Sequence, residues 1–173
     1  MKTELFWIEG PWPGRLAILP RPRGGDWLED EVRSWRQAGV GAVVSLLTSE
    51  EAADLDLVHE AELCRANQMD FVSFPIVDRS VPPSQKETVA LVQRLDALLT
   101  AGTNVVIHCR QGLGRAAVLA ACTLVRAGID PEAALQRVSK ARGCSVPETT
   151  EQRNWVIAFA RTLAALPRES RHP

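Results

Sequence analysis

The stretch that decides the fold is Asn104-Val-Val-Ile-His-Cys-Arg-Gln-Gly-Leu-Gly-Arg115. Its first half is a short, β-branched apolar run, which is typical of a strand buried on both faces. Its second half contains two glycines, which allow the backbone to turn tightly. The residues that follow, 116–127, are apolar nearly all round, so they predict a helix at the centre of the fold. We therefore expect a buried strand, a tight loop and a central helix, in that order.

Strand-like and helical segments alternate on either side of this stretch. Further strands are expected at 42–47 and 70–76, and helices at about 26–39, 48–66 and 84–102, with two more from 130 and from 150. Asp26 is expected to cap the first helix, and Thr48 with Glu51 forms a capping-box pattern for the second. Residues 1–25 predict short edge strands and turns. The alternation favours an α/β fold, a single domain with a mainly parallel central sheet flanked by helices.

Length and composition point to a small intracellular protein. The 173 residues suit one domain, expected to span 1–166, with a polar, disordered tail at 167–173. A formal net charge of −1 gives no reason to expect nucleic acid as a partner. The N-terminus lacks the apolar core of a secretory signal, and no apolar run approaches the ~20 residues of a membrane span. Four cysteines without CxxC spacing indicate a reducing cytoplasm, and we expect a monomer with no metal or cofactor.

The loop after the strand has the parts of a phosphate site. It lies beyond the carboxyl end of a strand, where α/β folds bind their ligands. Backbone N–H groups of the loop and of the helix N-terminus are expected to point at one anion. Arg115 adds a planar guanidinium that can donate to two phosphoryl oxygens. The predicted phosphate-binding residues are Arg110, Gln111, Gly112, Leu113, Gly114 and Arg115.

Cys109 is the predicted nucleophile of this loop. N–H donors and a guanidinium favour the thiolate, because they stabilise negative charge on sulfur. A cysteine and an arginine separated by five residues are by themselves a common chance pattern, and a structural cysteine is the alternative. The upstream strand, His108, the glycines and the downstream helix make the pattern specific. Arg115 is then expected to stabilise the transferred phosphoryl group.

The segment His108-Cys-Arg-Gln-Gly-Leu-Gly-Arg115 resembles the HCxxGxxR signature of the cysteine-dependent protein tyrosine phosphatases. Residues 74–78, Phe-Pro-Ile-Val-Asp, resemble the segment that carries the general acid in the dual-specificity branch. The Gly-Leu-Gly-Arg ending and the turn at 75–83 are most similar to the cyclin-dependent kinase-associated phosphatase subgroup. The resemblance covers about residues 42–127 and implies a phosphocysteine intermediate with Asp78 as general acid. Position alone would make Asp78 an ordinary turn residue before prolines.

The resemblance also assigns supporting roles. His108 is expected to hold the loop and tune the thiolate through hydrogen bonds. Gln152 resembles a glutamine that orients the hydrolytic water in some relatives, but it also occupies the N3 position of a capping box with Thr149. Ala116 departs from the family, which usually has Ser or Thr directly after the loop arginine. This departure predicts slow breakdown of the phosphoenzyme.

More than one substrate class fits the sequence. Phosphotyrosine and phosphoserine or phosphothreonine proteins are expected, because no segment resembles the phosphotyrosine-recognition loop of tyrosine-specific relatives. An inositol phosphate or phosphoinositide is the second candidate, since Arg79 and Arg110 add positive charge. Segment 47–54 is expected to border the cleft, where its acids would oppose a polyanion. A pseudophosphatase that only binds phosphorylated partners and a rhodanese-type sulfurtransferase complete the candidate functions.

Overall fold

A five-stranded sheet forms the centre of the computed structural model, which describes residues 4–167. The strand order is β1 (Phe6–Ile8), β2 (Leu16–Leu19), β5 (Asn104–His108), β3 (Val40–Ser45) and β4 (Asp70–Ser73). Only the β1–β2 pair is antiparallel among these described strands; β2–β5, β5–β3 and β3–β4 are parallel. The predicted α/β fold with a mainly parallel sheet is therefore confirmed. Apart from Pro167, the predicted tail lies outside the described residues.

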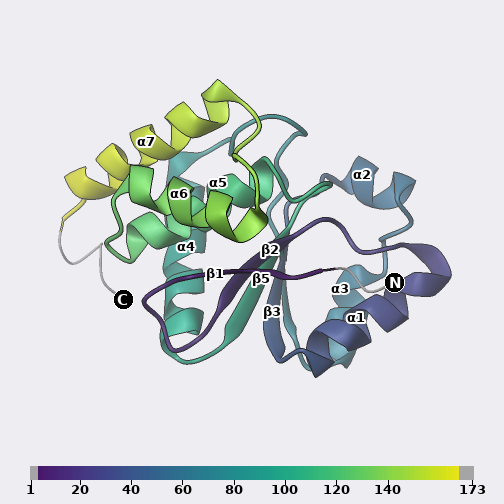
Figure 1. Ribbon diagram of the computed structural model, residues 1–173. Helices are drawn as coiled ribbons and strands as arrows, with labels where there is room; N and C mark the ends of the chain where they lie inside the picture. The colour runs from purple at the N-terminus through teal and green to yellow at the C-terminus, as the bar shows by residue number, and fades with distance from the viewer. Residues whose placement is uncertain (1–3, 168–173) are drawn as a thin grey trace.

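Helices cover both faces of the sheet (Figure 1). They are α1 (Leu28–Gln37), α2 (Ser49–Asp54), α3 (Glu60–Ala66), α4 (Gln85–Thr100), α5 (Arg115–Arg126), α6 (Pro131–Arg142) and α7 (Thr150–Ala165). Helices α1 and α3 pack on one face, and α4 to α7 lie on the other, with α5 between α4, α6 and α7. Between residues 4 and 167, no helix combines the length and apolarity that a membrane span requires.

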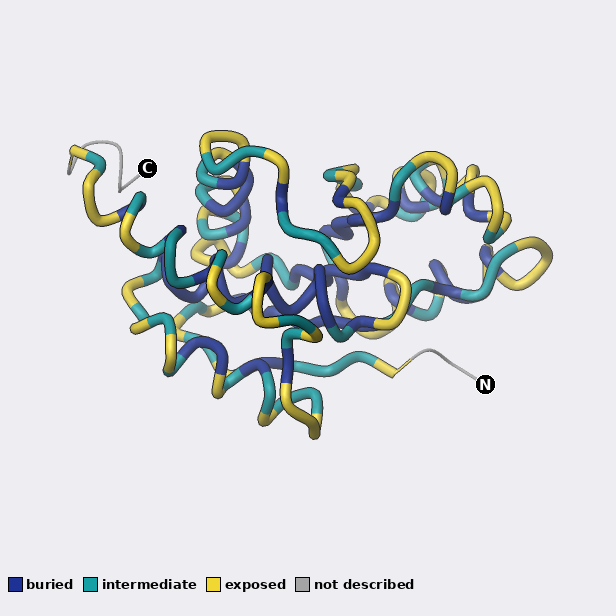
Figure 2. The backbone as a smooth tube through the Cα atoms, turned by 90° about the horizontal axis from the view of Figure 1, so that it is seen from above, coloured by how far each residue is buried: buried dark blue, intermediate teal, exposed yellow. Residues whose placement is uncertain are grey.

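The core is divided into two layers by the alternation of side chains along the strands. In β5, Val105 and Ile107 pack with the α4–α7 layer, whereas Val106 packs with α1 and α3. Every residue of α5 is buried, as the apolar run 116–127 predicts. Figure 2 shows the buried segments gathered in the middle of the molecule and the exposed ones at its loops and outer helix faces. Strand β5 and helix α5 are both buried in the core, so they fix the two ends of the loop that connects them.

Three local expectations were wrong. Strand β2 is not an edge strand: it lies between β1 and β5 and is buried throughout, because its Leu-Ala-Ile-Leu run packs on both faces of the sheet. The predicted helix at 48–66 is two helices, since Asp56 adopts a left-handed φ of 57° and its carbonyl accepts from the N–H of Gly25. Helix α1 starts after a 3₁₀ turn that contains Asp26, with Trp27 at the N-cap and no side-chain cap.

The strand expected at 70–76 has regular pairing only to Ser73. Pro75 has no N–H to donate, which interrupts the ladder. The N–H groups of Phe74 and Ile76 still donate to the carbonyls of Ser45 and Leu46. Residues 74–76 therefore run beside the carboxyl end of β3. This path places Asp78 next to the loop that follows β5.

Candidate active site

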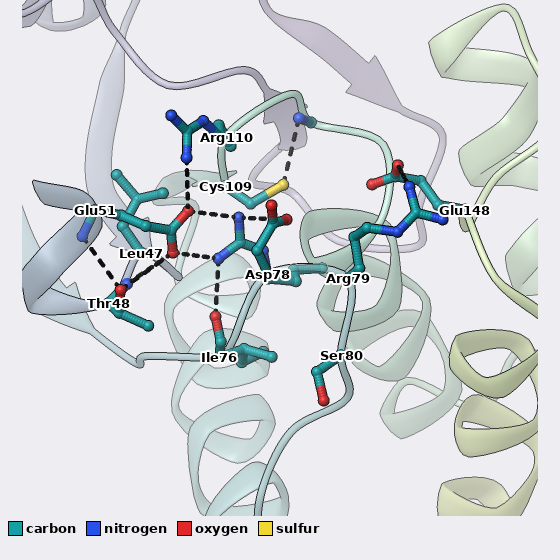
Figure 3. Close-up of polar contacts among 12 residues, drawn as sticks. Leu47, Thr48, Glu51, Ile76, Asp78, Arg79, Ser80, Cys109, Arg110 and Glu148 are labelled. Carbon is teal, nitrogen blue, oxygen red and sulfur yellow. Dashed lines mark hydrogen bonds and ion pairs between the residues drawn. The ribbon is translucent and has the colours of Figure 1, made fainter. Parts of the chain in front are cut away.

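The loop between β5 and α5 places its cysteine at the carboxyl edge of the sheet. Cys109 directly follows β5 and is 2% exposed, and its Sγ accepts a hydrogen bond from the N–H of Gly112 at 3.3 Å (Figure 3). Arg115 is the first residue of α5. The expected loop between a central strand and a helix is confirmed. A backbone donor aimed at sulfur is an arrangement that favours the thiolate.

Two glycines make the loop compact for different reasons. Gly112 has a φ of 71°, and a Cβ there would lie 2.6 Å from the carbonyl carbon of Leu19 in β2. Gly114 has no such backbone strain, but a Cβ would lie 2.6 Å from Glu148 Oε1 and 2.9 Å from Gln152 Nε2. The first glycine lets the loop dock on β2, and the second lets the start of α7 approach it.

The Arg115 side chain is held by several hydrogen bonds. Its guanidinium is buried, and the two terminal nitrogens make four hydrogen bonds. Nη1 donates to Glu51 Oε1 at 2.7 Å and to the Ile76 carbonyl at 2.8 Å, and Nη2 donates to Glu51 Oε2 at 3.0 Å. The fourth bond joins Nη2 to Asp78 Oδ1 at 3.0 Å. The side chain is held in one orientation before any ligand is present.

Glu51 clamps the guanidinium from helix α2. It is the N3 residue of the capping box with Thr48, whose hydroxyl accepts from the Glu51 N–H. Burial by itself raises the pKa of the Glu51 carboxyl, but hydrogen bonds from Arg115 and Thr48 and the Arg115 charge outweigh burial and lower it. Glu51 is therefore a carboxylate at neutral pH.

The same contacts act on Arg115. Burial by itself lowers the pKa of the guanidinium, but its hydrogen bonds to Glu51 and the negative charges of Cys109, Glu51 and Asp78 together raise it. Arg115 is thus a permanent cation in a site that also contains acids. This combination gives a rigid, charged donor beside the loop.

Asp78 lies on the opposite side of Arg115 from the core, with its side chain half exposed. The next residue, Arg79, has a φ of 60° and pairs with Glu148 at 3.6 Å. The carbonyl of Ser80 accepts from Gln152 Nε2 at 3.0 Å. The segment 78–80 therefore makes one contact with Arg115, through Asp78, and two contacts near the start of α7, through Arg79 and Ser80.

Gln152 is fully buried and forms the capping box with Thr149, as one of the two sequence interpretations predicts. Its Oε1 accepts from the N–H groups of Glu148 and Thr149, while Nε2 reaches Ser80. The side chain thus links the start of α7 to the segment that carries Asp78. Its predicted role in orienting water stays a prediction.

A small cavity brings the predicted residues together. It has a volume of about 80 Å³. It is lined by Asp78, Arg79, Cys109, Arg110, Gln111, Arg115 and Glu148. Leu113 packs against the core instead, so any contact that it makes with an anion comes from its backbone.

A family model described as "Swiss Army Knife protein, DSP-PTPase phosphatase domain" matches residues 4–172. The chain belongs to this phosphatase family. The match spans nearly the whole chain, whereas the sequence resemblance was placed on residues 42–127.

Curated proteins similar to this chain include a candidate tyrosine phosphatase, 197R, of Invertebrate iridescent virus 6. The two sequences are 27% identical over 159 residues, a match that covers 90% of this chain and 56% of the viral protein. Human cyclin-dependent kinase inhibitor 3 is 32% identical over 93 residues, 53% of this chain and 43% of its own length. The chain thus spans about half the length of the curated relatives it matches.

Solved structures share the fold of this chain. Kinase associated phosphatase, in a form with its catalytic-site cysteine replaced by serine, has a TM-score of 0.86 at 20% identity and covers 96% of this chain and 99% of its own. PTPMT1 has a TM-score of 0.72 at 18% identity, with 92% of this chain and 96% of its own covered. These likenesses support the α/β architecture described above.

Three contacts at or behind the loop were not expected from the sequence. Glu51 was recognised only as a helix-cap residue in a segment bordering the cleft. Arg142, at the end of α6, donates to the carbonyls of Gly112 at 3.3 Å and Gln111 at 3.4 Å, and its guanidinium stacks 4.1 Å above the Phe6 ring. Glu60 contacts His108. The capping-box pattern marked Glu51, but no local pattern marks the other two, because their partners are distant in sequence.

Proposed function

We propose that this phosphatase hydrolyses phosphate monoesters through a phosphocysteine intermediate, with Cys109, Arg115 and Asp78 as catalytic residues. The observation that supports this most is the shared cavity, which is lined by the thiol, the guanidinium and the carboxyl together. A nucleophile, an oxyanion-binding cation and a general acid within one cavity are the groups that phosphoryl transfer to cysteine requires.

In the proposed first half-reaction, the Cys109 thiolate attacks phosphorus, so that an S–P bond forms and the P–O bond to the leaving group breaks. Asp78, in its acid form, gives its proton to the leaving oxygen. Arg115 and the loop N–H groups stabilise the charge on the three phosphoryl oxygens. The alcohol or phenol then leaves.

In the second half-reaction, the Asp78 carboxylate takes a proton from a water molecule whose oxygen attacks phosphorus. The S–P bond breaks, the thiolate of Cys109 is restored and inorganic phosphate leaves. One monoester and one water give one alcohol and one phosphate, and Asp78 ends in its acid form. The reaction therefore balances without a metal or an organic cofactor.

Phosphoproteins are the proposed substrate class. Beside the active cavity lie two cavities of about 430 and 460 Å³ that share Thr48 and Ser49 as lining residues. Their linings include Glu50, Glu51 and Glu60, and none of the described lining residues is Lys or Arg. Glu51 is paired with Arg115 and Glu60 with His108, so the repulsion of a polyanion comes mainly from the exposed Glu50. An acid at this place accepts a polypeptide with neutral or basic neighbours. We therefore place phosphotyrosine and phosphoserine or phosphothreonine segments first.

An inositol phosphate or phosphoinositide is the second candidate. Arg79 and Arg110 line the active cavity, and each lies near an acid, Glu148 at 3.6 Å and Glu51 at 3.9 Å. A second phosphate on the substrate could replace those acids as a partner. PTPMT1, a structural neighbour, has been solved in complex with PI(5)P. The acidic lining of the adjacent cavities is what ranks this candidate below phosphoproteins.

Two further candidate functions make distinct predictions. A pseudophosphatase would bind a phosphopeptide but release no phosphate, and Ala116 is the feature that favours it. A rhodanese-type sulfurtransferase would react with thiosulfate and would not need Asp78, so the phosphatase family disfavours it. A cytoplasmic location and a monomeric state are also proposed; light scattering tests the second.

Hydrolysis of para-nitrophenyl phosphate tests the proposed chemistry. Cys109→Ser should lose all activity. Asp78→Asn should lose more activity on an alkyl phosphate than on this substrate, because para-nitrophenolate leaves without a proton. Cys144→Ser, which changes an exposed cysteine outside the cavity, is the matched control and should keep full activity. Full activity in Cys109→Ser would contradict the proposal. A panel of phosphopeptides and inositol phosphates then ranks the two substrate classes.

A further inference from the structure

A buried acid–histidine pair lies behind the catalytic loop. Glu60 is the first residue of α3, and His108 is the last residue of β5. Glu60 Oε1 is 2.6 Å from His108 Nε2, and the two side chains are 4% and 0% exposed. The other ring nitrogen, Nδ1, lies 3.3 Å from the carbonyl oxygen of Cys109. The ring therefore connects α3 to the backbone of the catalytic cysteine.

The partners of the two ring nitrogens indicate which nitrogen of His108 carries a hydrogen. A carbonyl oxygen can only accept, so Nδ1 must carry a hydrogen in order to bond to Cys109. The second proton lies between Nε2 and the Glu60 carboxyl, whichever of the two atoms holds it. In both forms the ring is oriented with its Nδ1–H toward Cys109. A carboxyl partner at one imidazole nitrogen is a common way of setting the tautomer at the other.

We propose that Glu60 is a positioning residue for catalysis, which acts through His108 to hold the Cys109 peptide. With the carbonyl of Cys109 anchored, its Sγ is kept under the N–H of Gly112 and turned toward the cavity. The inference rests on the proposed function only in taking Cys109 as the nucleophile. It assigns Glu60 an effect on thiolate reactivity, not contact with substrate.

The surroundings of the ring support this assignment. Trp35 of α1 has its ring centroid 6.3 Å from that of His108, and Leu19 and Ser45 pair with His108 on the adjacent strands. These three neighbours are uncharged. On α3, burial and then the Glu60 charge raise the pKa of Cys64 to about 12, so Cys64 remains a neutral thiol. Glu60 is thus the acid of this helix that contacts the ring.

The experiment compares Glu60→Leu with Glu60→Gln. Leucine removes the partner of Nε2, whereas glutamine can turn its amide to donate to Nε2 and so keep the hydrogen on Nδ1. The readout is the rate of Cys109 alkylation by iodoacetamide against pH, followed by mass spectrometry of the Cys109 peptide so that exposed Cys144 does not interfere. Alkylation reports the thiolate whether or not the protein turns over a phosphate ester.

We expect Glu60→Leu to slow alkylation at pH 6 about tenfold, the size of effect expected when one buried charged hydrogen bond is lost. The rate at high pH should match the wild type, because every Cys109 is then ionised. Glu60→Gln should recover most of the loss. On para-nitrophenyl phosphate, kcat should fall in Glu60→Leu with little change in KM. Glu62→Gln alters an exposed acid on the same helix, paired with His59, and should behave as the wild type.

Three results would overturn the proposal. The first is a wild-type alkylation profile in Glu60→Leu. The second is an equal loss in Glu60→Leu and Glu60→Gln, which would mean that charge and not ring orientation matters. The third needs no variant: long-range ¹H–¹⁵N spectra of the wild-type protein showing His108 Nδ1 without a proton. The spectra keep the proposal testable if Glu60→Leu fails to fold.

Discussion

Asp78 Oδ1 lies 3.0 Å from Arg115 Nη2, and both residues line the active cavity. The other terminal N–H groups of Arg115 bond to Glu51 and to the Ile76 carbonyl, inside the protein. A phosphoryl oxygen that binds this Nη2–H must therefore take the place of Asp78. Displacement would free the Asp78 carboxyl to approach the leaving oxygen. Substrate binding would then be coupled to the release of Asp78 from Arg115.

Removing the Asp78 charge should strengthen the binding of an oxyanion. We predict that Asp78→Asn binds tungstate about tenfold more tightly than the wild type, because an amide competes less well than a carboxylate for Arg115. Isothermal titration calorimetry measures the two dissociation constants. Asp70→Asn, which changes an exposed aspartate at the start of β4, should leave binding unchanged. Weaker binding in Asp78→Asn would show that Asp78 does not compete with the anion.

Glu51 should be required for both activity and stability. Glu51→Gln removes the buried carboxylate from Arg115 and leaves the guanidinium the half-exposed Asp78 and the Ile76 carbonyl as its other partners. Breaking a buried ion pair typically costs about 3 kcal/mol of unfolding free energy. We expect phosphatase activity to fall at least about tenfold as Arg115 loses its orientation. Urea unfolding and steady-state kinetics measure the two effects. Glu50→Gln, an exposed neighbour on α2, is the control; equal losses in both variants would remove the special role of Glu51.

The lowered pKa of Glu51 gives a pH dependence with a definite sign. A carboxyl whose folded pKa lies below its ordinary value of 4.5 stabilises the protein above that value and loses this contribution as pH falls through the folded pKa. The unfolding free energy of the wild type should therefore drop more steeply below about pH 4.5 than that of Glu51→Gln. Urea titrations between pH 3 and pH 7 test this, and parallel curves for the two proteins would contradict it.

Gly112 should not tolerate a side chain. Gly112→Ala combines a φ of 71° with a Cβ placed 2.6 Å from the Leu19 backbone, so the loop must leave β2. We expect loss of activity and a fall in stability of about 2 kcal/mol. Gly102→Ala is the matched control, because its φ of 94° is also left-handed but no atom lies within 4 Å of the new Cβ. Similar losses in both variants would attribute the effect to backbone strain alone.

Ala116 should limit the second half-reaction. It is fully buried in the first turn of α5, directly after Arg115. We predict that Ala116→Ser raises turnover and reduces the trapped phosphoenzyme, because a hydroxyl there can stabilise the departing thiolate. Rapid-quench measurement of the intermediate tests this. Ala117→Ser places a hydroxyl at the next buried position and should not speed breakdown. If Ala116→Ser changes neither turnover nor the amount of trapped phosphoenzyme, Ala116 does not limit the second half-reaction.

The core elements could be predicted because their patterns are local. The run 104–109, the glycines and the apolar helix after Arg115 predicted β5, the loop and α5 within a residue or two. The break between α2 and α3 could not be predicted, because Asp56 turns there to meet Gly25, which lies far away in the sequence. Strand β2 was misplaced for a similar reason: its partners β1 and β5 decide whether it is an edge.

The sequence by itself determined the loop between Cys109 and Arg115, since these residues and the glycines are close along the chain and the order strand–loop–helix follows from local periodicity. Only the tertiary structure decided what surrounds that loop. Glu51, Glu60 and Arg142 reach it from α2, α3 and α6, and each contact joins residues at least 30 positions apart. Such contacts depend on how helices pack against both faces and the carboxyl edge of the sheet, and packing over that distance leaves no periodic signal in the chain.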